Sequence, residues 1–333
     1  MDETNAVYTI EREKPPFKRV GWTFFAILSI TTLLQIIGAA VAYAFAPNIT
    51  HAPWFVWALS FAPLYLIAIP LGYIIIRPLP KLKVPQQSIG FKKFLAYLAM
   101  SYAIMYVGNI IGTMLNGGIA QLRGQELINP LEQLLTGSNI YFELVFVGLL
   151  APVFEELVFR KLLLDRIRAY GEGTAILVSG LCFGLFHGNL FQFFYAFGLG
   201  ALFAYIYLRT GRVRYTIILH AIINSFSVLL SVLMGSIDLE ALQNFSGEDP
   251  NELINALQGN LAQYAVFGLC MLAIMTLFVW GIVLLITKRK SAVLFTAPNE
   301  LPKKGRFKTV FVSWGMALFM LLSLGLMTYS ALA

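Results

Sequence analysis

The chain has 333 residues, of which 58% are hydrophobic and only 12% are charged, and its formal net charge is +7. Soluble domains are about half apolar and about a quarter charged, so this composition excludes an ordinary soluble protein and indicates one that is solvated by lipid. In such a protein Lys and Arg first report which connections stay in the cytoplasm, so we expect the lipid bilayer, and not nucleic acid, to be the partner of this positive charge.

Apolar runs recur along the chain with lengths close to the roughly 20 residues that cross a hydrocarbon core. They predict an all-α polytopic membrane protein with about nine spans, two of them short. The spans cover residues 20–46, 53–77, 91–117, 139–165, 173–188, 190–209, 214–235, 263–287 and 309–330. The first nineteen residues are polar and charged, which predicts a cytoplasmic tail and no cleavable signal peptide.

Basic residues lie at alternate connections between these spans. They form five groups, at Arg12 to Arg19, Arg77 to Lys93, Arg160 to Arg168, Arg209 to Arg214 and Lys288 to Lys308. Only Arg123 falls at the opposite side. Because cytoplasmic loops are enriched in Lys and Arg, we expect a cytoplasmic N-terminus and an external C-terminus.

Two connections have a distinct character. Residues 236–260 contain five acidic residues and no basic one, which predicts an acidic external loop. Residues 117–139 are moderately apolar with Arg123, Glu126 and Glu132, which favours an interfacial or re-entrant helix. The predicted organisation is a tail (1–19), N-terminal helices with the interfacial segment (20–138), a core (139–235), the acidic loop (236–262) and C-terminal helices (263–333).

The fourth span contains two adjacent carboxylates in apolar surroundings, Glu155 and Glu156. Ionised side chains are costly in a bilayer, so intramembrane acids are candidates for function. Glu156 and Arg160 are four residues apart and can pair on one helix face, whereas Glu155 points elsewhere, into a cavity where a carboxylate can act as a general base. A buried ion cluster that only fixes helix packing is the structural alternative.

Two of the three histidines lie in later spans. His187 lies among glycines that recur every fourth residue, Gly180, Gly184 and Gly188, and form a small-residue face that allows another helix to approach closely. His220 and Asn224 are four residues apart and share one helix face. His51, in contrast, is expected at the surface of an external turn.

Three motifs follow one another in the predicted core: Glu-Glu-x-x-x-Arg at residues 155–160, Phe-x-x-x-His at 183–187 and His-x-x-x-Asn at 220–224. In this order they resemble the CPBP family of intramembrane proteases, which includes the type II CAAX prenyl endopeptidases and the bacteriocin-processing and immunity proteins. The resemblance covers about residues 139–235. It also includes the Thr210-Gly211 turn before the last motif.

The resemblance implies a helical membrane enzyme with a cavity open toward the cytoplasm, an endopeptidase that cuts peptide or membrane-anchored protein substrates. Glu155 and His187 would activate water. His220 and Asn224 would stabilise the developing oxyanion, which suits donors that are fixed in a dry site. Glu156 and Arg160 would orient these groups. Because compact members look bacterial, we expect a multi-pass protein of a bacterial plasma membrane.

The family has been described both as metalloproteases and as glutamate-dependent enzymes that act without a metal. Glu155, His187 and His220 could supply three ligands to a catalytic zinc with water in the fourth position. Zinc and a metal-independent mechanism both stay open at this point.

Two other functions fit parts of the sequence. A family member that keeps the scaffold without catalysis would act as a bacteriocin immunity or peptide-binding membrane protein. A proton-coupled transporter would use the same polar groups as a relay, but the chain has no internal repeat of the kind that many transporters show.

Overall fold

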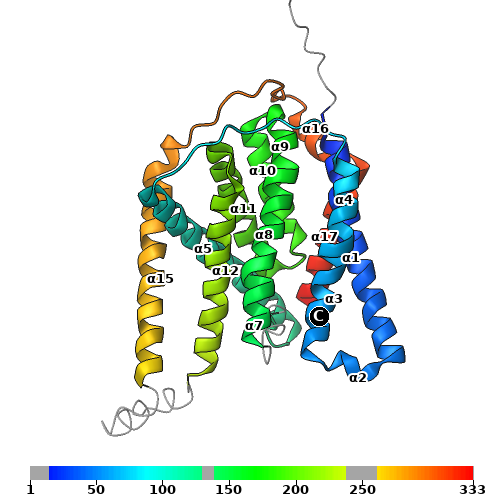
Figure 1. Ribbon diagram of the computed structural model, residues 1–333, viewed down its shortest axis with the longest axis vertical. Coiled ribbons are helices and arrows are strands. Elements are labelled where there is room, and N and C mark those ends of the chain that lie inside the picture. The colour runs from blue at the N-terminus through cyan, green and yellow to red at the C-terminus, as the bar shows by residue number, and fades with distance from the viewer. Residues whose placement is uncertain (1–14, 130–138, 238–260, 333) are drawn as a thin grey trace, which may run out of the picture.

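The computed structural model describes residues 15–129, 139–237 and 261–332, and all regular structure within these ranges is helical. Figure 1 shows a bundle in which α1 (Phe17–Phe45), α3 (Pro53–Ala62) and α4 (Ile69–Ile76) lie on one side and α12 (Val213–Gly235) and α15 (Leu261–Lys288) on the other. The predicted core (residues 139–235) consists of α12 and the helices from α7, which begins at Ile140, to α11, which ends at Thr210. The predicted all-α membrane fold is confirmed.

The central helices follow in chain order. A continuous helical run comprises α7 (Ile140–Glu143), the π-helical η2 (Leu144–Leu150), α8 (Ala151–Glu156), the π-helical η3 (Leu157–Leu164), α9 (Asp165–Ile167) and the 3-10 turn η4 (Arg168–Tyr170). It is followed by α10 (Glu172–Phe186) and α11 (Leu190–Thr210). The remaining elements are α2 (Pro47–Thr50), the π-helical η1 (Pro63–Ala68), α5 (Phe91–Arg123), the 3-10 turn η5 (Arg289–Ser291), α16 (Arg306–Phe311) and α17 (Trp314–Leu332).

Seven helices of the described ranges are long and apolar enough to cross a membrane, compared with about nine predicted spans. The run from α7 to α9 contains too many charged residues, including Glu155, Glu156 and Arg160, to qualify by composition. α10 has only 15 residues, fewer than a full crossing needs. Both differences fall on helices that carry two of the three polar motifs of the core, Glu-Glu-x-x-x-Arg and Phe-x-x-x-His, where burial in protein replaces contact with lipid.

The end of α5 differs from the sequence prediction. We expected this span to end at Gly117, but the helix continues through Gly117 and Gly118 to Arg123. It stops at Gly124, whose φ of 66° is the left-handed conformation that commonly ends helices. Part of the predicted interfacial segment is therefore helix α5, and its residues 130–138 lie outside the described ranges, as do residues 238–260 of the predicted acidic loop.

The described connections that contain basic residues gather at one end of the bundle, which we call the basic end (Figure 1). There the backbone N–H of Leu82 donates to the carbonyl of Asp165 at 2.7 Å, and that of Gln87 donates to the carbonyl of Thr210 at 2.8 Å. The chain thus brings three of the predicted cytoplasmic connections together. This arrangement fits the predicted topology.

Close packing of α10 against α11 depends on two glycines. A Cβ atom at Gly180 would lie 2.9 Å from the carbonyl oxygen of Phe197, and one at Gly184 would lie 2.9 Å from that of Phe193. The predicted close helix approach is therefore confirmed for these two positions. Gly188 lies beyond the end of α10 with a φ of 63° and serves the turn into α11 instead.

Candidate active site

Pro152 is the second residue of α8, which carries the two glutamates. Proline has no backbone N–H, so the preceding turn of the helix keeps carbonyl groups that need other donors. Asn224 Nδ2 donates to the carbonyl of Val147 at 3.0 Å, and Ser225 Oγ donates to that of Gly148 at 3.3 Å. The proline therefore ties α12, with the His-x-x-x-Asn motif, to the helix of the Glu-Glu motif.

The predicted pair of Glu156 and Arg160 is present and fully buried. Arg160 Nε donates to Glu156 Oε2 at 2.8 Å and Nη2 donates to Oε1 at 3.2 Å, a two-point pairing. The remaining guanidinium nitrogen, Nη1, donates to Ser179 Oγ on α10 at 2.8 Å. Arg160 thus links the glutamate helix to the helix that precedes His187.

Glu156 also holds His220. The Nδ1 atom of His220 lies 3.3 Å from Glu156 Oε1, and because a carboxylate accepts, Nδ1–H is the donor. This contact directs the other ring nitrogen, Nε2, toward Glu155, whose Oε2 lies 3.9 Å away. The side chain of Glu155 is 18% exposed whereas that of Glu156 is fully buried, so the two neighbours face different surroundings, as the helix geometry predicted.

His187 lies just beyond the end of α10. Its Nδ1 donates to the carbonyl of Phe183 at 2.8 Å, a bond that fixes the ring and leaves Nε2 of a neutral imidazole with its lone pair. The ring of Phe183 stands edge-on to His187, with the centroids 5.0 Å apart, and also edge-on to His220, at 5.8 Å. Phe183 is therefore packed between the two histidines.

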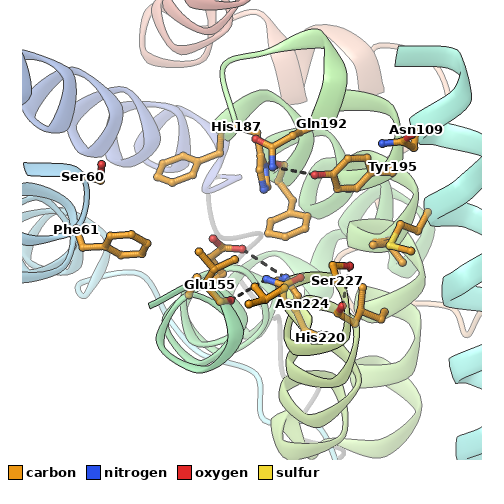
Figure 2. Close-up of a pocket in the computed structure, with 18 of the residues that line it drawn as sticks. Ser60, Phe61, Asn109, Glu155, His187, Gln192, Tyr195, His220, Asn224 and Ser227 are labelled. Carbon is orange, nitrogen blue, oxygen red and sulfur yellow. Dashed lines mark hydrogen bonds and ion pairs between the residues drawn. The ribbon is translucent and has the colours of Figure 1, made fainter. Parts of the chain in front are cut away.

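One pocket of about 570 Å³ brings four of the six predicted site residues together, namely Glu155, His187, His220 and Asn224. Figure 2 shows their side chains around this space. Glu156 and Arg160 do not line the pocket and lie behind Glu155 and His220. The arrangement places an acceptor carboxylate, two imidazoles and an amide on one cavity, which is a set that can activate water and stabilise negative charge.

Several polar residues of the site escaped the sequence analysis. Ser179 accepts from Arg160, and Gln192 Nε2 donates to Tyr195 Oη at 2.8 Å on the pocket wall. Asn109, on α5, lines the pocket as well (Figure 2). Asn109 and Gln192 are amides within apolar runs, a signal that could have marked them as candidates.

The predicted zinc ligands do not fit a metal site as they are placed. Within the described ranges, no group of three or more His, Cys, Asp or Glu side chains could hold a metal ion. We therefore derive no step through a metal, and the zinc hypothesis stays a prediction that an activity measurement must test.

Comparisons with known proteins support the resemblance. Residues 137–226 match the family described as type II CAAX prenyl endopeptidase Rce1-like. This segment contains all six predicted site residues, so the resemblance on which they were chosen is confirmed.

Two relatives are named proteases or peptidases. The chain is 26% identical over 152 residues to the "Membrane-embedded CAAX protease MroQ" of Staphylococcus aureus, a match that covers 43% of this chain and 60% of that protein. It is 24% identical over 239 residues to the "Putative membrane peptidase YdiL" of Bacillus subtilis, covering 69% of this chain and 90% of that protein. No solved structure matches significantly. This chain is thus a multi-pass membrane protein with a CAAX protease-like core.

Proposed function

We propose that this protein is an intramembrane endopeptidase of the cell membrane that hydrolyses peptide bonds with water activated by Glu155. The observation that carries the proposal is the placement of Glu155 Oε2 opposite His220 Nε2, 3.9 Å apart, on the wall of a pocket that also contains His187 and Asn224. The match of residues 137–226 to the CAAX endopeptidase family supports the same class of reaction.

In the proposed reaction a water molecule binds between Glu155 and the carbonyl carbon of the scissile bond. Glu155 takes one proton from this water while the water oxygen forms a bond to the carbonyl carbon. His187, whose Nε2 has a lone pair, accepts the second hydrogen of the water and aligns it. When the C–N bond breaks, Glu155 returns its proton to the leaving amine, so that one water and one peptide bond give a carboxylic acid and an amine. The acid then passes its proton to the amine, which leaves a carboxylate and an ammonium group.

His220 and Asn224 stabilise the tetrahedral intermediate in this proposal. In this proposal His220 is an imidazolium with a proton on both ring nitrogens: Nδ1–H stays bound to Glu156 and Nε2–H donates to the oxyanion. Asn224 uses one amide hydrogen for the carbonyl of Val147 and keeps the other for the oxyanion. Each such donor commonly contributes a factor of about 100 to 1,000 to the rate.

The lining of the pocket indicates the kind of substrate. Besides the polar groups, apolar and aromatic side chains form much of the wall, including Phe61, Leu64, Tyr65 and Met105. Burial of apolar surface on these groups favours a peptide with large hydrophobic residues beside the scissile bond. We propose membrane-anchored proteins or hydrophobic peptides as substrates.

The test is cleavage of a quenched-fluorescence peptide library by purified protein in mild detergent. His187→Ala is compared with His51→Ala, because His51 lies exposed in the turn after α2 and outside the pocket. We expect wild-type protein and His51→Ala to cleave the same peptides and His187→Ala to lose at least about 100-fold in rate. No cleavage by the wild type across a broad library would instead favour a non-catalytic immunity or peptide-binding function.

A further inference from the structure

A second polar pocket lies at the basic end of the bundle, separate from the candidate active site. It has a volume of about 440 Å³ and shares no lining residue with the pocket of Glu155. Three cationic side chains line it, Lys93, Arg168 and Arg209, and Glu172 is the one acidic residue among its lining residues. The formal charge around this pocket is therefore +2.

The wall of this pocket is fixed by the connection between α15 and α16. The backbone N–H of Asn299 donates to the carbonyl of Ala169 at 2.8 Å, and that of Leu301 donates to the carbonyl of Tyr170 at 3.2 Å. The N–H of Phe295 donates to Glu172 Oε2 at 2.8 Å. In Figure 1 this connection crosses the basic end above α10 and α11. The pocket is thus a built feature of the fold and no chance gap between surface side chains.

Arg209 has donors that nothing within the described ranges satisfies. Its Nη2 pairs with Glu172, and its guanidinium lies 4.4 Å from the ring centroid of Phe295. Its Nε and Nη1 atoms are buried without a hydrogen-bond partner, and so is Nη1 of Arg168. Buried donors that stay unpaired are costly and rare. Three such donor nitrogens on two guanidinium ions suit an anion that offers several oxygen acceptors, and phosphate is a group that arginine binds in this way.

An apolar pocket continues from this site toward the membrane interior. It has a volume of about 460 Å³, lies between α5, α11 and α15, and shares Lys93, Tyr205 and Ser291 with the polar pocket. Its further lining includes the apolar side chains of Met100, Leu202, Leu284 and Leu285, and the cations Lys288 and Arg289. A free phosphate ion would leave this apolar space without a role, whereas an acyl chain fills it.

We propose that the basic end binds an anionic phospholipid, with its phosphate at Lys93, Arg168 and Arg209 and one acyl chain in the groove between α5, α11 and α15. These cations stand where helices end, at the depth at which headgroups of the cytoplasmic leaflet lie in the predicted topology. Basic pockets between transmembrane helices on that side are a recurring form of headgroup recognition. The proposal does not depend on the proposed peptidase activity.

The experiment is a titration of the purified full chain, in an uncharged detergent, with phosphatidylglycerol or phosphatidylcholine, with bound lipid counted by native mass spectrometry. We compare wild type with Lys93→Gln/Arg168→Gln. Because each basic group near an anionic membrane surface contributes about a factor of five in affinity, the double variant should bind phosphatidylglycerol roughly 25-fold more weakly. The charge-matched control is Lys303→Gln/Lys304→Gln, two exposed residues at the same end, which should bind like wild type.

Preference for phosphatidylglycerol over phosphatidylcholine, lost in the pocket variant and kept in the control, supports the proposal. Equal binding of the two lipids, or equal loss in both double variants, overturns it. Full displacement of the lipid by millimolar inorganic phosphate also overturns it, because the ligand would then be a soluble phosphate. If the double variant does not fold, Lys93→Gln alone gives the same test with an expected loss of about fivefold, since Lys93 is exposed.

Discussion

Glu155 and His220 face each other from different helices, with Oε2 of the glutamate 3.9 Å from Nε2 of the histidine. This separation is too long for a direct hydrogen bond but brings both groups within reach of one reacting centre. Glu156, the next residue after Glu155, accepts from Nδ1 of His220, so this buried carboxylate orients the histidine that faces Glu155. The following predictions test how this arrangement is held and what it does.

Replacing Arg160 with methionine should destabilise the fold strongly. Both Arg160 and Glu156 are fully buried, so Arg160→Met leaves an uncompensated carboxylate and should lower the free energy of unfolding by about 3–5 kcal/mol. Lys161→Met is the control, because the neighbouring Lys161–Asp165 pair is 44% exposed on the lysine side and such pairs contribute about 0–1 kcal/mol. Denaturant titration in detergent measures the free energy of unfolding of both variants. Equal losses would show that the buried pair has no special role.

Gly184→Val should separate α10 from α11 and remove activity. The added Cβ would lie 2.9 Å from the carbonyl oxygen of Phe193, and backbone cannot yield as a side chain can. We expect a loss of about 1–3 kcal/mol or more, with cleavage lost because His187 follows three residues later. Gly268→Val on α15 has open space around it and serves as the control for the cost of valine in a helix. Thermal unfolding and cleavage rates are measured for both variants, so that the loss of stability and the loss of activity can be compared. Normal activity in Gly184→Val would contradict the account of this helix contact.

Asn224→Ala should lower the rate more than it lowers stability. It removes the bond to the carbonyl of Val147 and the proposed oxyanion donor, for an expected rate loss of about 100-fold or more. Ser225→Ala removes the parallel bond to Gly148 without touching the pocket lining, so it should lose about 1 kcal/mol of stability and little rate. Initial cleavage rates at saturating peptide, measured for both variants, distinguish the loss of an oxyanion donor from the loss of a packing contact. A similar rate in both variants would assign Asn224 to helix packing alone.

Chelation should leave cleavage intact. Glu155, His187 and His220 do not form a three-ligand group, and the proposed water activation uses no metal. We expect the rate after dialysis against a chelator to stay within about twofold of the untreated rate, with metal content measured in the same samples. If the chelator removes activity and added zinc restores it, the result would instead support the zinc site predicted from the sequence.

Local geometry made part of the site predictable. The pairing of Glu156 with Arg160 follows from their spacing of four residues on one helix, and the close approach at Gly180 and Gly184 follows from small residues on one face. The contact of Glu155 with His220 depends instead on how two helices cross, which the sequence pattern does not contain. The same holds for Ser179, which meets Arg160 only in the folded bundle.

For the basic residues, too, the sequence predicts which connection each one belongs to but not which of them meet in the folded protein. Their distribution predicts the topology, because it depends only on which connection each residue belongs to. It does not reveal that Arg168 and Arg209 share one pocket, since that depends on how the connection after α15 folds back over α10. The continuation of α5 past Gly117 and Gly118 was missed because a glycine costs a helix only about 1 kcal/mol and does not by itself end it.

The most direct measurement is the initial rate of peptide cleavage by Glu155→Gln, compared with wild type and with Glu126→Gln, an exposed carboxylate outside the pocket. Glutamine keeps the size of the side chain but cannot take a proton from water. We predict a loss of at least about 100-fold for Glu155→Gln, with unchanged folding, and no loss for Glu126→Gln. Cleavage by Glu155→Gln at the wild-type rate would contradict the proposal that Glu155 activates the water.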